Sequence, residues 1–401
     1  MTQIRQTNGV GDELIRSEAY ALFCRGALPD PHPPLHELRQ REPVNWSPLL
    51  NAWLITRCDD VLDLARDTRA VLDRTDASFD QLPLDLRRET EPFSKHVWNW
   101  LGMTDLPKHT RLRQIITHAF TPKVIRKLEP RIRHIALDLL DRAKANSNTP
   151  DLKTQFADRL PATVICEMLD IPTDMHEQFC AWTLGLVQGV EKTGPTLIEG
   201  VKTAQQAYEQ MCDFMMPIIH ERRKRPGQDL MSLLAQTEYE DQRLNDDEML
   251  GMSVFLFVAG HETMVNLLAK AIMLLLSHLN GLDLTMTDET VMSTAIEEAL
   301  RYESSITFLG RASGEDMVIR GQPIRKGQII MLMMNAANRD PPRFADADRF
   351  DVIRRDNKHV AFGWGIHLSL GAPLARCEAA IAFDVLFKRY PKSELVDWEP
   401  K

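Results

Sequence analysis

Residues 245–278 constrain the fold more than any other stretch, because they follow a helical pattern without a break. A helix of about 34 residues would extend roughly 50 Å. It would be apolar on nearly all sides through residues 254–258 and again through residues 267–276. A helix of this kind must run through the middle of a protein, so we expect a large and mainly helical fold.

The centre of this helix reads Ala259-Gly260-His261-Glu262-Thr263. A glycine, an acid and a β-branched alcohol are poor choices for the middle of a buried helix. Thr263 could donate a hydrogen bond back to the Ala259 carbonyl and open the helix locally, which would leave room for a ligand or water. The acid and the alcohol could also be purely structural. We interpret His261 as a packing residue and not as a ligand.

A second informative stretch is the loop at residues 362–371, Phe-Gly-Trp-Gly-Ile-His-Leu-Ser-Leu-Gly. Three glycines in this loop, followed by an apolar helical run at residues 372–386, predict a tight turn whose backbone comes close to a flat group. Such a loop suits a bound cofactor.

This loop resembles the haem-binding loop of the cytochrome P450 family, Phe-Gly-x-Gly-x-His-x-Cys-x-Gly, at every fixed position but one. The exception is Ser369, which stands where the family has the cysteine that binds the haem iron. The resemblance implies haem b as cofactor, contacts to it from Phe362, Gly363, His367 and Gly371, and Ser369 as the iron ligand.

The implied fold is mainly α with small β-sheets, the triangular helical domain that surrounds a buried haem in this family. We expect residues 1–401 to form one such domain, with residues 1–33 as an N-terminal extension that is loosely ordered at its start.

Further basic residues match the family. His109 and Arg113 are four residues apart and share one face of a predicted helix. Without the resemblance, they would be interpreted as a solvated basic face. With it, they are implied to bind the haem propionates, as is Arg311 at the end of a short apolar strand at residues 306–311.

The long helix also fits the family. The resemblance implies that Ala259 and Gly260 contact the haem. It further implies that Glu262 and Thr263 form the acid-alcohol pair that delivers protons during oxygen activation.

Glu298 and Arg301 are three apart on a predicted helix and, alone, would be a solvent-exposed ion pair. The resemblance implies instead a buried structural network that contains a third residue from a later segment. We expect Arg349 to be this partner.

The implied substrate pocket is apolar, which favours a hydrophobic or aromatic small molecule. Its candidate residues are Val97, Leu101, Phe255, Val258, Ile306 and Phe308.

Three other segments carry structural predictions. Residues 44–46 and 53–56 flank a turn and predict a β-hairpin. Residues 81–100 mix prolines, aromatics and charges and predict a long irregular loop. Residues 185–195 contain several glycines and predict a flexible helix connection, which the resemblance implies to be the lid over the substrate channel; an ordinary helix connection is the alternative.

Composition limits the partners. A net charge of −9 and a pI of about 5.8 provide no overall basic footprint for nucleic acid. The six cysteines are scattered without zinc-like spacing, which fits a reduced, cytoplasmic protein. The N-terminus lacks the apolar core of a signal peptide, and we expect no membrane span. The resemblance is therefore to the soluble bacterial type, which implies a monomer with a ferredoxin/ferredoxin reductase-type electron donor.

Six basic residues could form a docking patch for that acidic donor, or simply a solvated surface. They are Lys108, Arg111, Lys123, Arg126, Lys127 and Arg376.

Ser369 changes the implied chemistry. A cysteine thiolate donates electron density through the iron and favours O–O cleavage, whereas a serine oxygen is harder and less polarizable. A single ligand change in an otherwise complete enzyme favours an engineered variant of a bacterial monooxygenase, similar to designs for carbene or nitrene transfer. The alternatives are the parental activity in weak form, as hydroxylation or oxidative C–C/C–N coupling, and a non-catalytic haem-binding or sensing protein.

Overall fold

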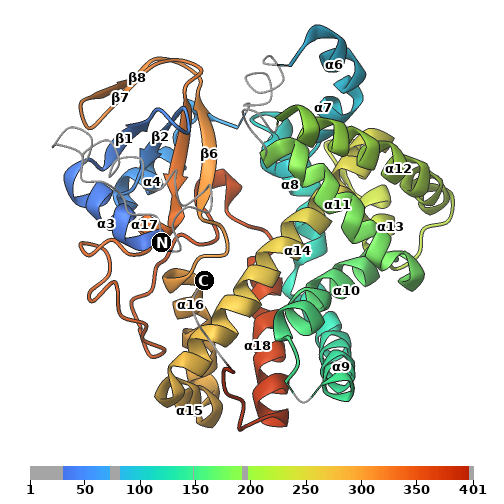
Figure 1. The fold of residues 1–401 in the computed structure, drawn as a ribbon. Helices are drawn as coiled ribbons and strands as arrows, with labels where there is room; N and C mark the ends of the chain where they lie inside the picture. The colour runs from blue at the N-terminus through green and yellow to red at the C-terminus, as the bar shows by residue number, and fades with distance from the viewer. Residues whose placement is uncertain (1–29, 73–81, 148, 192–196, 397–401) are drawn as a thin grey trace. The chain divides into compact units, whose positions relative to one another are not determined.

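A computed structural model describes residues 30–72, 82–147, 149–191 and 197–396. The chain is mainly helical with small sheets, as predicted (Figure 1). It divides into two compact units, and each is described separately below. Unit 1 comprises residues 1–74, 290–369 and 395–401, and unit 2 comprises residues 75–289 and 370–394. Residues 1–29 of the N-terminal extension lie outside the described residues.

Unit 1 combines short helices with a sheet and a small hairpin. Its elements are α3 (His32–Arg41), β1 (Val44–Ser47), β2 (Ala52–Ile55), α4 (Cys58–Leu64), β3 (Ala70–Val71), α16 (Glu289–Tyr302), β6 (Phe308–Ser313), β7 (Met317–Ile319), β8 (Gln322–Ile324), β9 (Ile329–Met333) and α17 (Met334–Ala337).

The main sheet of unit 1 has the strand order β1-β2-β9-β6-β3. The predicted hairpin is confirmed as the antiparallel pair β1–β2, and β2 then pairs in parallel with β9. Side chains alternate between the two faces of the sheet. Ile55 and Leu332 pack into one hydrophobic cluster with α4, and Leu54 and Met333 pack into another with α3.

A buried ion-pair network joins α16 to the segment that follows α17. The side chains of Glu298 and Arg301 are fully buried, and Arg301 Nε donates to Glu298 Oε2 at 2.8 Å. The third partner is Arg354, whose Nε lies 3.1 Å from Glu298 Oε2. The prediction of Arg349 is wrong, because its side chain is 67% exposed and only its backbone carbonyl accepts from Arg301.

Asn338 connects this network to the glycine-rich loop. Its backbone carbonyl accepts from Arg301 at 2.9 Å, and its side-chain Oδ1 accepts from the backbone N–H of Val360 at 2.8 Å. Asn338 is fully buried. One side chain therefore fixes the start of the loop relative to the ion-pair network.

The loop itself is held by backbone hydrogen bonds and two left-handed glycines. Gly363 and Gly365 have φ angles of 75° and 70°. The N–H of Ser369 donates to the Phe362 carbonyl at 2.9 Å, which closes the loop. A Cβ atom on Gly365 would lie 2.6 Å from the Ala65 carbonyl oxygen, so both backbone angle and space require glycine there.

Unit 2 is built from helices of very different length. Its elements are α6 (Leu84–Glu89), α7 (Glu91–Val97), η1 (Leu101–Met103), α8 (Lys108–Thr117), η2 (His118–Phe120), α9 (Pro122–Asn146), the π-helix η3 (Lys153–Ala157), α10 (Arg159–Met168), η4 (Thr173–Met175), α11 (His176–Glu191), α12 (Leu197–Lys224), α13 (Leu230–Gln236), β4 (Glu238–Tyr239), β5 (Gln242–Arg243), α14 (Asp246–Ser277), α15 (Leu279–Thr287) and α18 (Ala372–Arg389).

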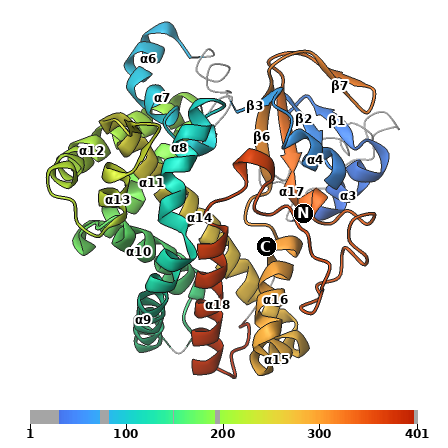
Figure 2. The same ribbon diagram turned by 180° about the vertical axis from the view of Figure 1, so that it is seen from behind.

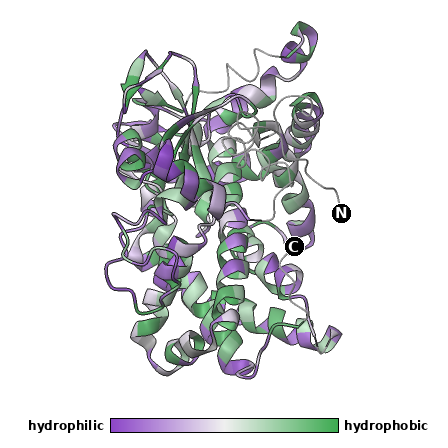
Figure 3. Cartoon of the chain, turned by 60° about the vertical axis from the view of Figure 1, so that its left-hand side comes forward, coloured by the Kyte–Doolittle hydropathy of each residue, from purple (hydrophilic) through white to green (hydrophobic). Residues whose placement is uncertain are grey.

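The predicted long helix is confirmed as α14, and it lies beside α10 and α18 (Figure 2). Asn245 caps its first turn, and Glu248 returns the bond in a capping box. Most of its side chains are buried. Figure 3 shows hydrophobic and hydrophilic residues interspersed along the helices of the chain. The apolar composition of α14 thus reflects its place in the core of unit 2.

The predicted irregular loop at residues 81–100 is wrong for most of its length, because α6 and α7 occupy it. Pro83 is the N-cap of α6, and Pro92 lies in the first turn of α7. Proline is tolerated there since the first N–H groups of a helix have no intrahelical partner. The prolines start helices here and do not break them. Gln81 lies outside the described residues.

The predicted flexible connection at residues 185–195 is also wrong in its first part, because α11 continues to Glu191. A Cβ atom on Gly185 would lie 2.9 Å from Ala207, and one on Gly189 would lie 2.5 Å from Ala204. Both glycines thus allow α11 and α12 to pack closely. Residues 192–196 of the predicted lid lie outside the described residues.

The ion-pair network predicts that Arg354 contributes much more to stability than Arg349, five residues earlier in the chain. Replacing Arg354 by alanine removes a partner of the buried Glu298 carboxylate and should lower the free energy of unfolding by about 2–4 kcal/mol. Arg349→Ala is the matched control and should change it by about 0.5 kcal/mol or less. Urea titrations of the three proteins measure this. An equal loss in both variants would contradict the assignment of Arg354.

The loop geometry makes Gly365 sensitive to any side chain. Gly365→Ala should cost about 2 kcal/mol or more, because alanine is strained at positive φ and the Ala65 carbonyl would have to move. Gly371→Ala is the control, since Gly371 has an ordinary right-handed backbone with φ −75° and ψ −6°. Thermal unfolding compares the two variants, and an unchanged midpoint for Gly365→Ala would rule out the strain.

Candidate functional site

One face of α14 is less buried than the rest of the helix. Phe255, Val258, Ala259, Thr263 and Asn266 are only half-buried, although most residues of the neighbouring turns are buried. Their spacing of three or four residues places them on the same side of the helix. This strip of mostly apolar and small residues is the part of α14 that could contact a flat, apolar cofactor.

The centre of this strip has the predicted hydrogen bond. Thr263 Oγ1 donates to the Ala259 carbonyl at 2.7 Å, while α14 remains helical at this point. The hydroxyl proton is therefore used within the helix, and its lone pairs remain able to accept a hydrogen bond. The Glu262 side chain next to it is exposed.

Gly260 and His261 face other parts of unit 2. A Cβ atom on Gly260 would lie 2.9 Å from Ile165 on α10, so the missing side chain allows these two helices to pack and leaves only the Gly260 backbone for a cofactor. His261 Nε2 lies 3.2 Å from the Asp158 carbonyl, and its ring packs on Phe257. This confirms the interpretation of His261 as a packing residue.

Of the two predicted pocket residues that precede α8, Leu101 lies in a segment that packs against α14, whereas Val97 lies in the core. A Cβ atom on Gly102 would lie 2.8 Å from the Phe255 ring, so η1, which begins at Leu101, packs directly against the half-buried face of α14. Leu101 is 6% exposed, and Val97 on α7 is completely buried. The structure thus brings the Leu101 segment to Phe255 and places Val97 in the core.

His109 and Arg113 lie one turn apart on α8, as predicted. His109 is buried, and burial followed by the charge of Arg113 lowers the pKa of His109 to about 4. Burial also lowers the pKa of Arg113. At neutral pH this face of α8 therefore carries one guanidinium charge and one neutral imidazole. Both groups can donate hydrogen bonds to an anion.

In unit 1 the loop places the predicted iron ligand at its end. Ser369 is exposed, and its hydroxyl has no hydrogen-bond partner among the described residues. Gly363 is buried, whereas Phe362 and His367 are half-buried. Gly371 follows in unit 2 as the N-cap of α18. The loop thus leaves Ser369 Oγ as an accessible oxygen on a backbone that is fixed by hydrogen bonds.

Strand β6 presents its predicted site residues on different faces. Leu309 lies 3.5 Å from the Cβ position of Gly363, and Arg311, two residues further along the strand, shares its face. Arg311 is buried and donates to the Gly310 carbonyl at 2.9 Å. Phe308 packs instead against the cluster with Leu54 and Met333. Of the two, only Arg311 is on the loop side; Ile306, half-buried, precedes the strand.

The predicted basic patch is partly used for structure. Lys108 Nζ donates to the Asn99 side chain at 2.6 Å, and Arg111 forms an ion pair with Glu248 at the start of α14. Lys123, Arg126 and Lys127 are exposed on α9. The exposed members of the predicted patch are therefore these three α9 residues, and Arg376 on α18 is half-buried.

Two further observations concern metal ligands and membrane-spanning helices. Within the described ranges, no group of three or more His, Cys, Asp or Glu side chains could hold a metal ion. Within the same ranges, α14 has the length and apolar composition to cross a membrane, and half of its most apolar window is buried inside the protein.

Sequence reasoning missed Arg354 and Asn338. Arg354 is one of several arginines in its segment, and the sequence pattern does not tell which of them is buried. Asn338 is an asparagine in a polar stretch that gives no signal at all. Both become identifiable only from their contacts with Glu298, Arg301 and Val360.

Comparison with known proteins places the chain in a family. A family model described as Cytochrome P450 matches residues 87–281 and 285–397. The polyketide biosynthesis cytochrome P450 PksS of Bacillus subtilis (strain 168) is 35% identical over 375 residues, which cover 91% of this chain and 90% of that protein. The mycinamicin IV hydroxylase/epoxidase of Micromonospora griseorubida is 37% identical over 360 residues, which cover 88% of this chain and 87% of that protein.

Solved structures agree. The structure of Bacillus subtilis 168 PksS matches with a TM-score of 0.82 and 33% identity over 96% of this chain and 92% of that chain. P450BioI, solved in complex with an acyl carrier protein that carries hexadec-9Z-enoic acid, matches with a TM-score of 0.83 and 28% identity over 96% of this chain and 95% of that chain. The chain therefore belongs to the cytochrome P450 family, whose members are haem monooxygenases.

Proposed function

We propose that this protein is a cytochrome P450-type enzyme in which Ser369 replaces the cysteine that binds the iron of haem b. The observation that carries the proposal is the glycine-rich loop, which has the family pattern and ends on an exposed serine hydroxyl with a fixed backbone. We further propose that residues 1–401 act as one domain, since each unit contains segments from distant parts of the sequence.

Each unit, considered by itself, contains residues that suit a haem. In unit 2, the half-buried strip of α14 offers an apolar surface through Ala259 and the Gly260 backbone, and His109 and Arg113 offer donors for propionates. In unit 1, Arg311 lies on the same face of β6 as Leu309, which contacts the loop. Phe362, Gly363, His367 and Gly371 of the glycine-rich stretch complete the proposed cofactor contacts.

When bound, haem supplies an iron centre that activates dioxygen, or a diazo or azide-like reagent. As a ligand, the Ser369 oxygen would donate less electron density than a thiolate, and oxygenation would be weaker. We therefore propose that this form is suited to carbene or nitrene transfer, with native oxygenation impaired. Thr263, whose hydroxyl donates a hydrogen bond to the Ala259 carbonyl, would hold a water molecule by accepting a hydrogen bond from it. The exposed Glu262 would exchange protons with solvent.

The substrate would be a hydrophobic small molecule. Phe255 and Val258 on α14, with Leu101 beside them, supply the apolar surface that supports this class. The names of the relatives, a polyketide biosynthesis protein and a mycinamicin hydroxylase/epoxidase, point in the same direction. We propose a cytoplasmic monomer that takes electrons from a ferredoxin-type donor, which the exposed basic residues of α9 would favour.

The spectrum of the reduced protein with carbon monoxide tests the ligand. Ser369→Cys should give the red-shifted absorption band of a thiolate ligand, and the Ser369 protein should not. Cys377→Ser is the control and should leave both spectra unchanged, because burial raises the pKa of Cys377 to about 11 and keeps it a neutral thiol. A thiolate band in the Ser369 protein that Cys377→Ser abolishes would identify Cys377 as the ligand instead.

The reaction type has its own test. With ethyl diazoacetate and styrene as probes, under dithionite and without oxygen, the Ser369 protein should form more cyclopropane per haem than Ser369→Cys. Gas chromatography measures the product. Ser369→Ala should lie below both, since alanine provides no protein oxygen or sulfur to the iron. Equal yields from all three proteins would show that residue 369 does not control the reaction.

A further inference from the structure

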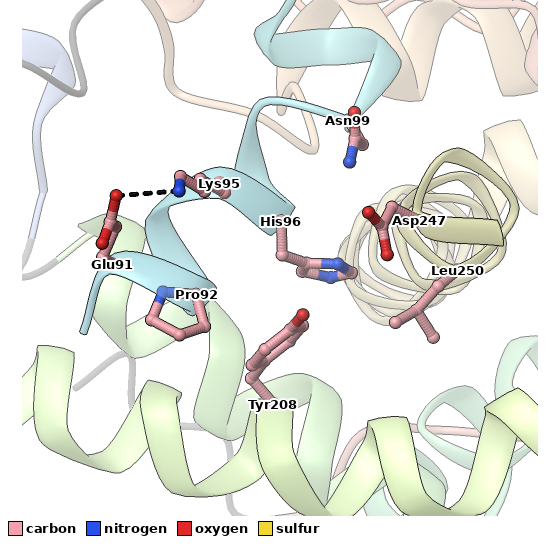
Figure 4. Close-up of a pocket in the computed structure, with 8 residues that line it drawn as sticks. All are labelled: Glu91, Pro92, Lys95, His96, Asn99, Tyr208, Asp247 and Leu250. Atoms are coloured by element: carbon pink, nitrogen blue, oxygen red, sulfur yellow. Dashed lines mark ion pairs between the residues drawn. The ribbon is translucent and has the colours of Figure 1, made fainter. Parts of the chain in front are cut away.

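A pocket of about 240 Å³ lies in unit 2, away from the strip on α14 (Figure 4). It is bounded by α7, by α12 and by the first turn of α14. Its inner wall consists of His96, Asn99, Tyr208 and Leu250. None of these residues belongs to the proposed haem or substrate contacts, so the pocket needs an explanation of its own.

His96 offers this pocket a hydrogen-bond donor. Its side chain is buried, and the Trp100 indole N–H donates to His96 Nε2 at 3.1 Å. Because an indole can only donate, Nε2 is the acceptor and the ring proton resides on Nδ1. Burial lowers the pKa of His96 to about 3, so the ring is neutral. Among the described residues, no acceptor for the Nδ1 proton is found.

The rim of the pocket carries one uncompensated charge. Lys95 Nζ and Glu91 Oε1 form an ion pair at 2.8 Å, which cancels both charges. The exposed Asp247 carboxylate, in the first turn of α14, has no ion pair or hydrogen bond with any residue that the structure describes. Of the charged side chains that line the pocket, Asp247 is therefore the one without an ion pair among the described residues, and its negative charge favours a cation. Lys108 lies outside this lining and donates to the Asn99 side chain.

Aromatic and apolar groups form the rest of the wall. The rings of His96 and Tyr208 lie 4.8 Å apart between their centroids, and the buried Leu250 closes the side toward α14. Figure 4 shows His96, Tyr208 and Asp247 converging on the same space. Aromatic faces attract a cation and pack against an apolar body.

We propose that this pocket is a second small-molecule site that binds an aromatic or apolar amine, with the protonated amine on Asp247 and the apolar body against Tyr208 and Leu250. His96 Nδ1 donates to an acceptor on the ligand where one is present. This assignment does not depend on the identity of the haem ligand.

A file of rings connects the pocket to the α14 strip. The centroid distances are 5.9 Å between His96 and Trp100 and 6.2 Å between Trp100 and Phe255. A ligand that packs on His96 would therefore be linked to Phe255, the first residue of the half-buried face of α14, by the intervening Trp100 ring. The site is separate from this face but in packing contact with it.

Isothermal titration calorimetry on the haem-loaded full chain tests the site. The probes are 2-phenylethylammonium, the neutral 2-phenylethanol and the anionic 3-phenylpropionate. We expect only the ammonium to bind, and we expect the haem absorption spectrum, recorded in the same titration, to stay unchanged. The proposal would be overturned if 2-phenylethanol bound as tightly as the ammonium. It would also be overturned if the haem spectrum changed in proportion to the heat of ammonium binding, because the ligand would then bind at the haem.

Charge variants of the exposed Asp247 sharpen the test without disturbing the core. Asp247→Asn should weaken ammonium binding about tenfold or more, since it removes a charge-assisted hydrogen bond. Asp247→Lys should abolish it and admit 3-phenylpropionate instead. Asp241→Asn and Asp241→Lys change an exposed acid in the turn between β4 and β5 and should have no effect. Binding that survives Asp247→Lys would refute the site. Because the readout is heat, the result is independent of whether Ser369 binds iron.

Discussion

Unit 1 depends on a fully buried ion pair, Glu298 with Arg301 on α16. Removing two charges from water is costly, and attraction between them offsets this only if their remaining donors and acceptors are also satisfied. Arg301 meets this condition, because its guanidinium donates to Glu298 and to the backbone carbonyls of Asn338, Ala347 and Arg349. The planar fork of arginine is suited to so many partners at once. The position of the glycine-rich loop follows from it through Asn338 and Val360.

Unit 2 depends on α14, which has to form the core of the unit and also leave one face of its middle section accessible. Most residues on either side of its middle section are buried and stabilise the unit, while one face of the middle section is left partly uncovered. Gly260 allows α10 to approach one side of this middle section, and the Thr263 hydroxyl is bonded to the helix backbone. A polar sequence in the middle of a core helix is thus compatible with stability, because each polar group there is bonded to the backbone, exposed or in contact with another element.

The sequence was informative where the signal is local. The unbroken apolar pattern of residues 245–278 predicted α14, and the glycines of residues 362–371 predicted the tight loop that contains Ser369. It failed where burial depends on the tertiary fold. The sequence does not distinguish Arg349 from Arg354, although only Arg354 is buried against Glu298. The sheet face on which Phe308 lies depends on the strand register, because a shift of one residue would move every side chain to the opposite face. Prolines and glycines were misleading for the same reason. Pro92 lies in the first turn of a helix, where proline is tolerated, and Gly189 lies where α11 packs closely against Ala204 of α12; neither setting can be recognised from the sequence.

The parallel pairing of β2 with β9 has a consequence for how the chain is made. In this pair Ala52 is opposite Ile329, so the first hairpin acquires its neighbouring strand only after most of the polypeptide has been synthesised. The continuous segment of unit 2 that ends at residue 289 is complete well before that point. Contacts between residues close in sequence form faster than contacts between distant ones. The order of synthesis therefore favours packing of the helices between residues 75 and 289 before the sheet forms, whereas α18, which completes unit 2, is made after β9. The β1–β2 hairpin keeps one edge unpaired until β9 has been made.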